Sequence, residues 1–137
     1  MLRLVTRENH THNIFPGTSI LIYFKVIFPE LEMSQVKTMI DAKIGGKKVV
    51  VFSKTYCPYC TKAKKVLRNH YGKDLNEADV EIIEIENNPD CDAIQDYLKT
   101  LTGGRSVPRV FINGKCIGGG DETQALEQSG KLSGLLQ

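Results

Sequence analysis

The sequence of 137 residues contains no tryptophan, and the features that mark several protein classes are also missing. It has no run of about 18 to 20 consecutive apolar residues, so we expect no helix that crosses a membrane. It has no basic tract with interleaved aromatic residues, and the formal net charge of +2 gives no indication of nucleic acid binding. The four cysteines include a single close pair, which does not make a disulfide scaffold and favours a reducing compartment.

What is present is an ordinary globular composition, with 41% hydrophobic and 25% charged residues. Residues 1–32 differ from the rest, because they carry Arg3 and Arg7 and then an apolar run broken by Pro16, Gly17 and Lys25. We interpret residues 1–32 as an N-terminal extension, either targeting or disordered, and residues 33–137 as one compact domain. A cytoplasmic location is expected, with the mitochondrion as the alternative if the extension is a targeting segment.

The chain is organised around a CxxC pair, Cys57 and Cys60, between the β-branched run 49–52 and the helix-like run 61–70. A strand that feeds a helix places Cys57 at the helix N-terminus, where unpaired N–H groups and the helix dipole favour a thiolate. Pro58 lacks an N–H group and suits the first turn. The sulfur of Cys60, one turn on, can then attack a mixed disulfide at Cys57 or form a disulfide with it.

Alternatively, Cys57 and Cys60 could supply two of the four ligands of a structural zinc site. Such a site needs four ligands, and the remaining cysteines, Cys91 and Cys116, are isolated. The three histidines do not fall at zinc-finger spacing: His10, His12 and His70. The sequence therefore predicts redox chemistry, and no metal site is expected.

Periodicity predicts the order of the first elements. A helix over 34–44 is expected to begin at Ser34 as its N-cap and to end at Gly45 and Gly46, before a buried strand over 47–52. The helix after the CxxC pair is expected to bury Ala63, Val66 and Leu67. Its basic side chains are expected to face solvent: Lys62, Lys64, Lys65 and Arg68.

The second half continues with a strand over 80–86 and a helix over 91–101 that begins after Asp90 as its cap. This helix is expected to bury Ile94, Tyr97, Leu98 and Leu101. Asn113 and Gly114 predict a hairpin between strands 110–112 and 116–117. Two helices close the chain, one from Asp121 and one over 131–136.

Four ordered motifs give the chain a resemblance to a known family. They are residues 54–60, 94–98, 105–108 with 110–112, and 117–119. On these motifs the chain resembles the glutaredoxins of the thioredoxin-like superfamily, specifically the dithiol class with a Cys-Pro-Tyr-Cys site. The resemblance implies an α/β fold of the thioredoxin-like type, with a four-stranded mixed sheet flanked by helices. The absence of tryptophan argues against thioredoxin itself, whose usual site is Trp-Cys-Gly-Pro-Cys.

The resemblance implies a glutathione-dependent thiol–disulfide oxidoreductase that reduces protein–glutathione mixed disulfides and protein disulfides through Cys57 and Cys60. Glutathione would be a co-substrate, with no tightly bound cofactor. The implied partners are glutathione and glutathionylated or disulfide-bonded proteins, not nucleic acids or membranes, and a monomer is expected. The alternative is a dimer that binds an iron–sulfur cluster, although glutaredoxins with that role typically read Cys-Gly-Phe-Ser and lack the second cysteine found here.

The resemblance also implies a glutathione groove. Lys54 would pair with the thiolate or with the glycine carboxylate, for which Gln95 and Arg105 would also offer donors. A cis Pro108 would leave the Val107 backbone free to bind the cysteine of glutathione, and Asp121 and Glu122 would meet its α-amino group. The full set of implied groove residues is Lys54, Tyr59, Gln95, Arg105, Ser106, Val107, Pro108, Gly119, Gly120, Asp121 and Glu122.

Overall fold

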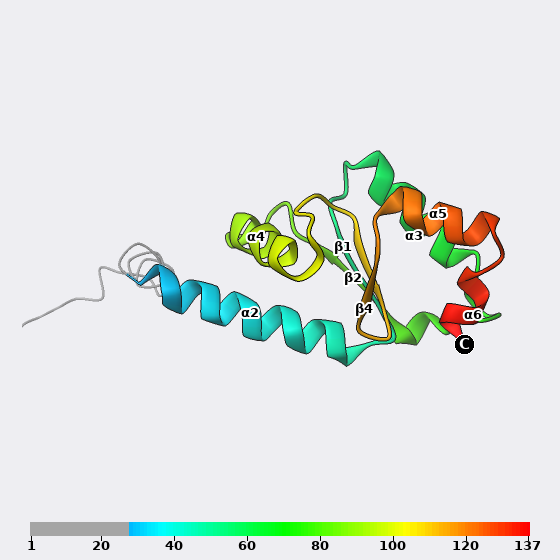
Figure 1. The fold of residues 1–137 in the computed structure, drawn as a ribbon, viewed down its shortest axis with the longest axis horizontal. Coiled ribbons are helices and arrows are strands. Elements are labelled where there is room, and N and C mark those ends of the chain that lie inside the picture. The colour runs from blue at the N-terminus through cyan, green and yellow to red at the C-terminus, as the bar shows by residue number, and fades with distance from the viewer. Residues whose placement is uncertain (1–27) are drawn as a thin grey trace, which may run out of the picture. The chain divides into compact units, whose positions relative to one another are not determined.

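The computed structural model of this chain describes residues 28–137, so the interpretation of residues 1–27 lies outside the described part. The chain divides into two compact units, Met1–Glu32 and Met33–Gln137. The described helices and strands follow one another in an alternating order that agrees with the sequence prediction (Figure 1). They are α2 (Pro29–Gly46), β1 (Val49–Ser53), α3 (Pro58–Arg68), η1 (Glu77–Asp79), β2 (Val80–Glu84), α4 (Cys91–Thr102), β3 (Arg109–Ile112), β4 (Lys115–Gly118), α5 (Gly120–Gln128) and α6 (Leu132–Leu136).

Four strands form one sheet in the order β2-β1-β3-β4. Strand β1 pairs parallel with β2 and antiparallel with β3, and β3 pairs antiparallel with β4. The predicted four-stranded mixed sheet is therefore confirmed. The predicted hairpin is present too, with Asn113 at φ 50° and Gly114 at φ 81°, the left-handed conformations that this tight turn requires.

Helices cover both faces of this sheet. On one face Val50 and Phe52 of β1 pack with residues of α2 and α4. On the other, Val49 and Val51 pack with residues of α3 and α6 (Figure 1). Because successive side chains of a strand point to opposite faces, a continuous apolar run is what a strand covered on both sides needs. Strand β1 thus lies at the centre of the domain, and the CxxC pair follows its last residue.

Helix α2 begins five residues earlier than the sequence predicted. Pro29 is its first residue, a position that tolerates the missing N–H, and Glu30 and Glu32 lie in the first turn where the helix dipole favours acidic groups. Ser34 is therefore inside the helix and not its cap, and its carbonyl accepts a hydrogen bond of 2.9 Å from the Thr38 hydroxyl. The predicted end at Gly46 is confirmed.

Three other expectations were wrong or incomplete. Lys64 is buried, not solvated, and its amine reaches Glu84 of β2 at 2.7 Å. Leu101, in the last turn of α4, is 45% exposed and not buried. The one-turn helix η1 was not predicted. Within residues 28–137, no helix is both long and apolar enough to span a bilayer.

Candidate functional site

Cys57 is the N-cap residue of α3, with φ −85° and ψ 120°. Its N–H donates to the Lys54 carbonyl at 3.1 Å, which closes the tight turn between β1 and α3. Its side chain is half-buried, and its sulfur lies 3.7 Å from the Val107 carbonyl oxygen. The sulfur therefore stands at a helix N-terminus, open to solvent on one side, as the sequence predicted.

Cys60 lies one turn further along α3 and is fully buried. The Lys54 N–H donates to its sulfur at 3.4 Å. Burial raises the pKa of the Cys60 thiol above its ordinary value, the Lys54 N–H and the Ser53 hydroxyl oppose this rise, and the neighbouring Cys57 adds to it. Both thiols are free, and their surroundings make Cys57 the accessible sulfur and Cys60 the protected one.

A hollow of about 290 Å³ lies beside the CxxC turn. The peptide bond between Val107 and Pro108 is cis, as the family resemblance implied. Eight of the predicted groove residues line the hollow, together with Arg109: Tyr59, Ser106, Val107, Pro108, Gly119, Gly120, Asp121 and Glu122. The structure thus brings most of the predicted groove together from three separate parts of the chain.

The other three predicted residues form a hydrogen-bonded chain of their own. The Lys54 amine donates to the Gln95 side-chain oxygen at 3.3 Å, and the Gln95 amide donates to the Arg105 carbonyl at 3.0 Å. The Arg105 guanidinium faces Asp96 at 3.3 Å and Asp92 at 3.8 Å. Arg105 is therefore engaged by carboxylates of α4, so a ligand carboxylate would have to compete with them or share the guanidinium.

The acidic residues at the start of α5 also have partners. Asp121 forms an ion pair of 2.8 Å with Lys62, whose amine lies 5.3 Å from the centre of the Tyr59 ring. Glu122 accepts a hydrogen bond of 2.9 Å from the Gly119 N–H, which caps the helix. A ligand ammonium at these carboxylates would therefore meet Lys62 as a competitor.

Gly120 lies where two helices come close together. A Cβ atom at this position would lie 2.6 Å from the Tyr59 carbonyl oxygen. Its missing side chain therefore allows the backbones of α5 and α3 to meet beside the hollow.

Sequence reasoning missed two cations at this site. Lys62 was assigned to the solvated face of α3, since its spacing does not reveal that α5 returns beside it. Arg109 donates to the Ser106 hydroxyl at 3.1 Å, and its guanidinium lies against Gly104 so closely that a Cβ there would be 1.9 Å from it. The only sequence signal for Arg109 was its position directly after Pro108.

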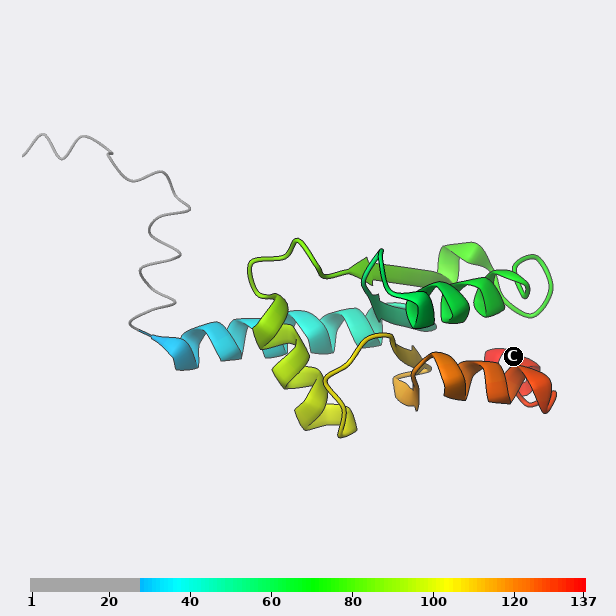
Figure 2. The ribbon, with the colours of Figure 1, turned by 90° about the horizontal axis from the view of Figure 1, so that it is seen from above.

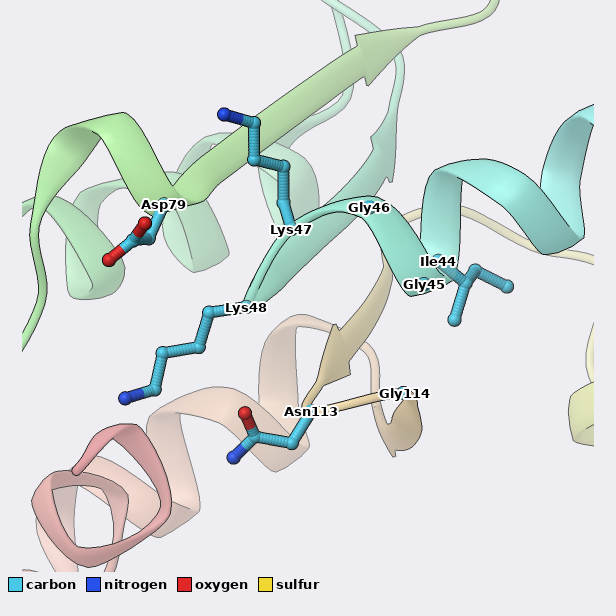
Figure 3. Close-up of a pocket in the computed structure, with 8 residues that line it drawn as sticks. All are labelled: Ile44, Gly45, Gly46, Lys47, Lys48, Asp79, Asn113 and Gly114. Carbon is cyan, nitrogen blue, oxygen red and sulfur yellow. The ribbon is translucent and has the colours of Figure 1, made fainter.

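A larger hollow of about 540 Å³ lies at the other end of β1, near Lys47, Lys48 and Asn113 (Figure 3). The two lysine side chains point in different directions there, and Lys47 already donates to the Ala78 carbonyl at 2.8 Å. No residue of the CxxC segment lines it, whereas Tyr59 of that segment lines the smaller hollow. The smaller hollow is therefore the better candidate for the functional site, although it has the smaller volume.

Known proteins match this chain in both sequence and fold. The glutaredoxin family model matches residues 49–117. The chain belongs to the glutaredoxin family. A glutaredoxin of Vernicia fordii is 46% identical over 93 residues, which is 68% of this chain and 84% of that protein.

Two solved structures extend the match to the fold. The crystal structure of oxidized glutaredoxin 2 from Chlamydomonas reinhardtii is 48% identical, has a TM-score of 0.70, and covers 77% of this chain and 94% of its own. The buckwheat glutaredoxin–glutathione complex is 36% identical, also with a TM-score of 0.70, and covers 78% of this chain and 92% of its own.

Membership in the glutaredoxin family explains the arrangement around the two thiols. The chain has the thioredoxin-like fold and is a glutathione-dependent thiol–disulfide oxidoreductase. Thiol–disulfide exchange needs an attacking thiolate that a bulky substrate can reach. In this glutaredoxin, the sulfur of half-buried Cys57 is accessible to such a substrate, and that of fully buried Cys60 is not.

Proposed function

We propose that this glutaredoxin reduces protein–glutathione mixed disulfides through Cys57 alone and protein disulfides through Cys57 together with Cys60. The observation that carries the proposal is the different exposure of the two sulfurs. Cys57 is half-buried at the helix N-terminus, beside the hollow, and Cys60 is fully buried directly behind it. A substrate sulfur can therefore reach Cys57, while Cys60 can react only with a sulfur already held at Cys57.

In the first cycle, the Cys57 thiolate attacks the glutathione sulfur of a protein–glutathione disulfide. The bond between the two substrate sulfurs breaks, the protein leaves as a thiolate that takes up a proton, and glutathione stays bound to Cys57 through a new disulfide. A second glutathione thiolate attacks the glutathione sulfur, which releases oxidised glutathione and restores the Cys57 thiolate. Cys60 takes no part in this cycle.

In the second cycle, Cys57 attacks a protein disulfide and forms a mixed disulfide with the protein. Cys60 then attacks the sulfur of Cys57, the second protein thiolate leaves, and a Cys57–Cys60 disulfide remains. Two molecules of glutathione reduce that disulfide. Cys60 lies in the first turn after Cys57 on the same helix, which supports its role as the resolving thiol.

The position of glutathione is part of the proposal. The buckwheat relative is a glutaredoxin–glutathione complex, and the hollow beside Cys57 supports the same co-substrate here. Arg109 would offer it a cation and Asp121 an anion, since both line the hollow. Glutathione carries two carboxylates and one ammonium, so a groove with charges of both signs fits it. We expect the Val107 backbone to bind its cysteine.

The test is a coupled assay, in which NADPH consumption by glutathione reductase follows the formation of oxidised glutathione. Wild-type protein should reduce both a glutathione mixed disulfide and a protein disulfide. Cys57→Ser should lose both activities, and Cys60→Ser should keep the first and lose most of the second. Loss of both in Cys60→Ser, with activity retained in Cys57→Ser, would reverse the two roles.

The alternative is an iron–sulfur protein in which two copies share a cluster through Cys57 and two glutathione molecules. Anaerobic reconstitution with iron, sulfide and glutathione separates the two proposals. We expect a colourless monomer afterwards, because glutaredoxins with that role typically read Cys-Gly-Phe-Ser, whereas this chain has Cys60 at the position of the serine. A coloured dimer whose absorbance disappears in Cys57→Ser would support the alternative.

We also propose that residues 33–137 are sufficient for activity and that residues 1–32 are an extension. In support, the matched family region is 49–117, and all the thiol and groove residues follow residue 33. A chain that lacks residues 1–32 should keep both activities, although it loses the first turn of α2. Comparing fluorescent fusions of the full and shortened chains would test whether the extension moves the protein from the cytoplasm to the mitochondrion.

A further inference from the structure

The last residue of β1, Ser53, has a polar side chain in a fully buried position. Among the contacts of residues 28–137, its hydroxyl oxygen has no hydrogen-bond partner. Buried hydroxyls normally have a hydrogen-bond partner in the protein, because burial removes their hydrogen bonds to water. A buried hydroxyl without a partner therefore needs an explanation. Valine, which fills the first three positions of this strand, would avoid the cost.

The Cys60 sulfur lies in the same buried region as this hydroxyl. Both residues are fully buried, and Lys54, the residue after Ser53, donates its backbone N–H to that sulfur at 3.4 Å. In agreement with this placement, the Ser53 hydroxyl opposes the rise in the Cys60 pKa that burial causes. A neutral thiol is a weak acceptor, whereas a thiolate accepts strongly. The hydroxyl therefore has a strong partner only when Cys60 is ionised.

We propose that Ser53 is a positioning residue for the resolving step, and that its hydroxyl donates a hydrogen bond to the Cys60 thiolate as this forms. The inference rests on the protein-disulfide branch of the proposed function. In that step Cys60 loses its proton and attacks the sulfur of Cys57. The disulfide between Cys57 and the substrate breaks, and the departing substrate thiolate takes up a proton. Ser53 keeps its own proton throughout and supplies only a dipole.

This role is needed at Cys60 and not at Cys57. The Cys57 sulfur is half-exposed at a helix N-terminus, so water and backbone N–H groups can stabilise its charge. Cys60 is fully buried, and within residues 28–137 the hydrogen bond that its sulfur accepts comes from the Lys54 N–H. Burial opposes its ionisation most strongly of all the influences on its pKa. A second donor would therefore act selectively on the resolving thiol.

The inference can be tested by timing Cys60 directly. One equivalent of dithiobis(nitrobenzoate) converts Cys57 into a mixed disulfide with release of one thionitrobenzoate, and the attack of Cys60 then releases a second, coloured one. Cys91 and Cys116 are replaced by serine in every variant so that only the CxxC pair reacts. The rate of the second release, measured against pH, reports the ionisation of Cys60.

Ser53→Ala should slow the second release of thionitrobenzoate at neutral pH by about three- to tenfold, which is the effect of one lost hydrogen bond. The pH at which this rate is half-maximal should also move upward. Reduction of a glutathione mixed disulfide should stay unchanged, because that cycle does not use Cys60, and this also shows that the variant is folded. The matched pair Ser53→Thr and Ser53→Val have the same shape but only threonine keeps the hydroxyl. Threonine should be faster than valine.

An unchanged rate and pH midpoint in Ser53→Ala would overturn the inference, as would equal loss in the threonine and valine variants, which would indicate a packing effect. Wild-type protein that releases no second thionitrobenzoate would overturn the protein-disulfide branch of the proposed function, and the inference with it. Normal wild-type release with an unaffected Ser53→Ala would overturn the inference alone.

Discussion

Helices α3 and α5 lie side by side, and their two ends differ in what holds them together (Figure 2). At the N-terminal end are Cys57 and the exposed ion pair between Lys62 and Asp121, of which Asp121 is 70% exposed. At the C-terminal end, buried His70 joins the helices, with one ring nitrogen 2.8 Å from Asp74 and the other 2.5 Å from Glu127. One helix pair thus has an open end and a closed end.

This difference between the two ends suggests that the open end serves catalysis and the closed end serves the stability of the fold. Exposed charges interact weakly because water screens them, so the open end can exchange protein partners for a substrate. At the closed end, both carboxylates can accept hydrogen bonds from His70 at once only if the ring is protonated. Asp74 also accepts a hydrogen bond from Ser133, which ties α6 to the same cluster. We therefore expect substitutions at the closed end to change the free energy of unfolding, and those at the open end to change catalysis.

The largest effect should come from the one place where the open end is tightly packed. Gly120→Ala puts a Cβ atom 2.6 Å from the Tyr59 carbonyl oxygen, so the two backbones must separate. We expect a loss of about 1–3 kcal/mol in the free energy of unfolding, the usual cost of overpacking, measured by denaturant titration. Reduction of a glutathione mixed disulfide should also fall, because α3 carries Cys57.

The matched control is Gly134→Ala in α6, where a Cβ atom would meet nothing within 4 Å. It should be neutral or stabilising by up to about 1 kcal/mol, since alanine favours a helix over glycine. Equal stability and activity in the two variants would show that α3 and α5 pack less tightly at Gly120 than the structure indicates.

His70 should give the next largest effect, and a dependence on pH. Burial lowers the pKa of His70, but the hydrogen bonds that its ring donates to Glu127 and Asp74 outweigh this and raise the pKa above its ordinary 6.5. A raised pKa in the folded state gives stability that is complete below pH 6.5 and is lost as the pH rises through the folded value. Unfolding free energy should therefore fall as the pH is raised from about 6.5 into the alkaline range.

The acid side has the opposite sign. The Ser133 and His70 hydrogen bonds, with the nearby charge of Lys73, lower the pKa of Asp74 below 3.8. That contribution is complete above pH 3.8 and is lost as the pH falls through the folded value. The cluster should therefore stabilise the fold most between about pH 4 and 6.5.

His70→Gln keeps a hydrogen-bonding side chain but cannot carry the charge. It should lower the free energy of unfolding by about 1–3 kcal/mol near pH 6 and flatten its decline toward alkaline pH. Glutathione-dependent activity of the folded protein should stay unchanged, since the cluster is at the opposite end of α3 from Cys57. A wild-type profile that is already flat above pH 6.5 would contradict the proposed charge on His70.

The same contrast explains what could be predicted from the sequence. Features set by neighbours in the chain were predicted correctly: the N-cap position of Cys57, the end of α2 at Gly46 and the turn at Asn113 and Gly114. Each depends on backbone geometry over a few residues. The cis bond before Pro108 was also expected, but only from the family resemblance.

Features that depend on distant segments were missed. Lys64 and Lys62 were predicted to be surface charges. In the structure Lys64 pairs with Glu84 of β2, and Lys62 pairs with Asp121 of α5. Ser53 and Cys60 share one buried region because the turn between β1 and α3 brings the Lys54 N–H to the Cys60 sulfur. Local patterns carry no information on such partners, since a charged residue on a helix usually faces solvent.

The smallest change in stability should come from the exposed pair at the open end, and here catalysis should separate from folding. Lys62→Ala removes the partner of Asp121, which at 2.8 Å and largely exposed should change the free energy of unfolding by less than about 1 kcal/mol. Lys43→Ala is the matched control, because it removes a partly exposed ion pair of 2.6 Å to Glu81 of β2, and neither residue lines the hollow beside the CxxC turn. Both variants should unfold at nearly the same denaturant concentration as wild type.

Only Lys62→Ala should alter the dependence of turnover on glutathione concentration. Its apparent KM for glutathione should be lower by about two- to fivefold, since Asp121 is then free to bind the glutathione ammonium. Asp121→Asn should raise the same KM. If Lys62→Ala and Asp121→Asn shift it in the same direction, Lys62 binds glutathione directly and does not compete with it for Asp121. If neither shifts it, the charges at this end are solvated surface groups, and selectivity for glutathione comes from the Val107 backbone.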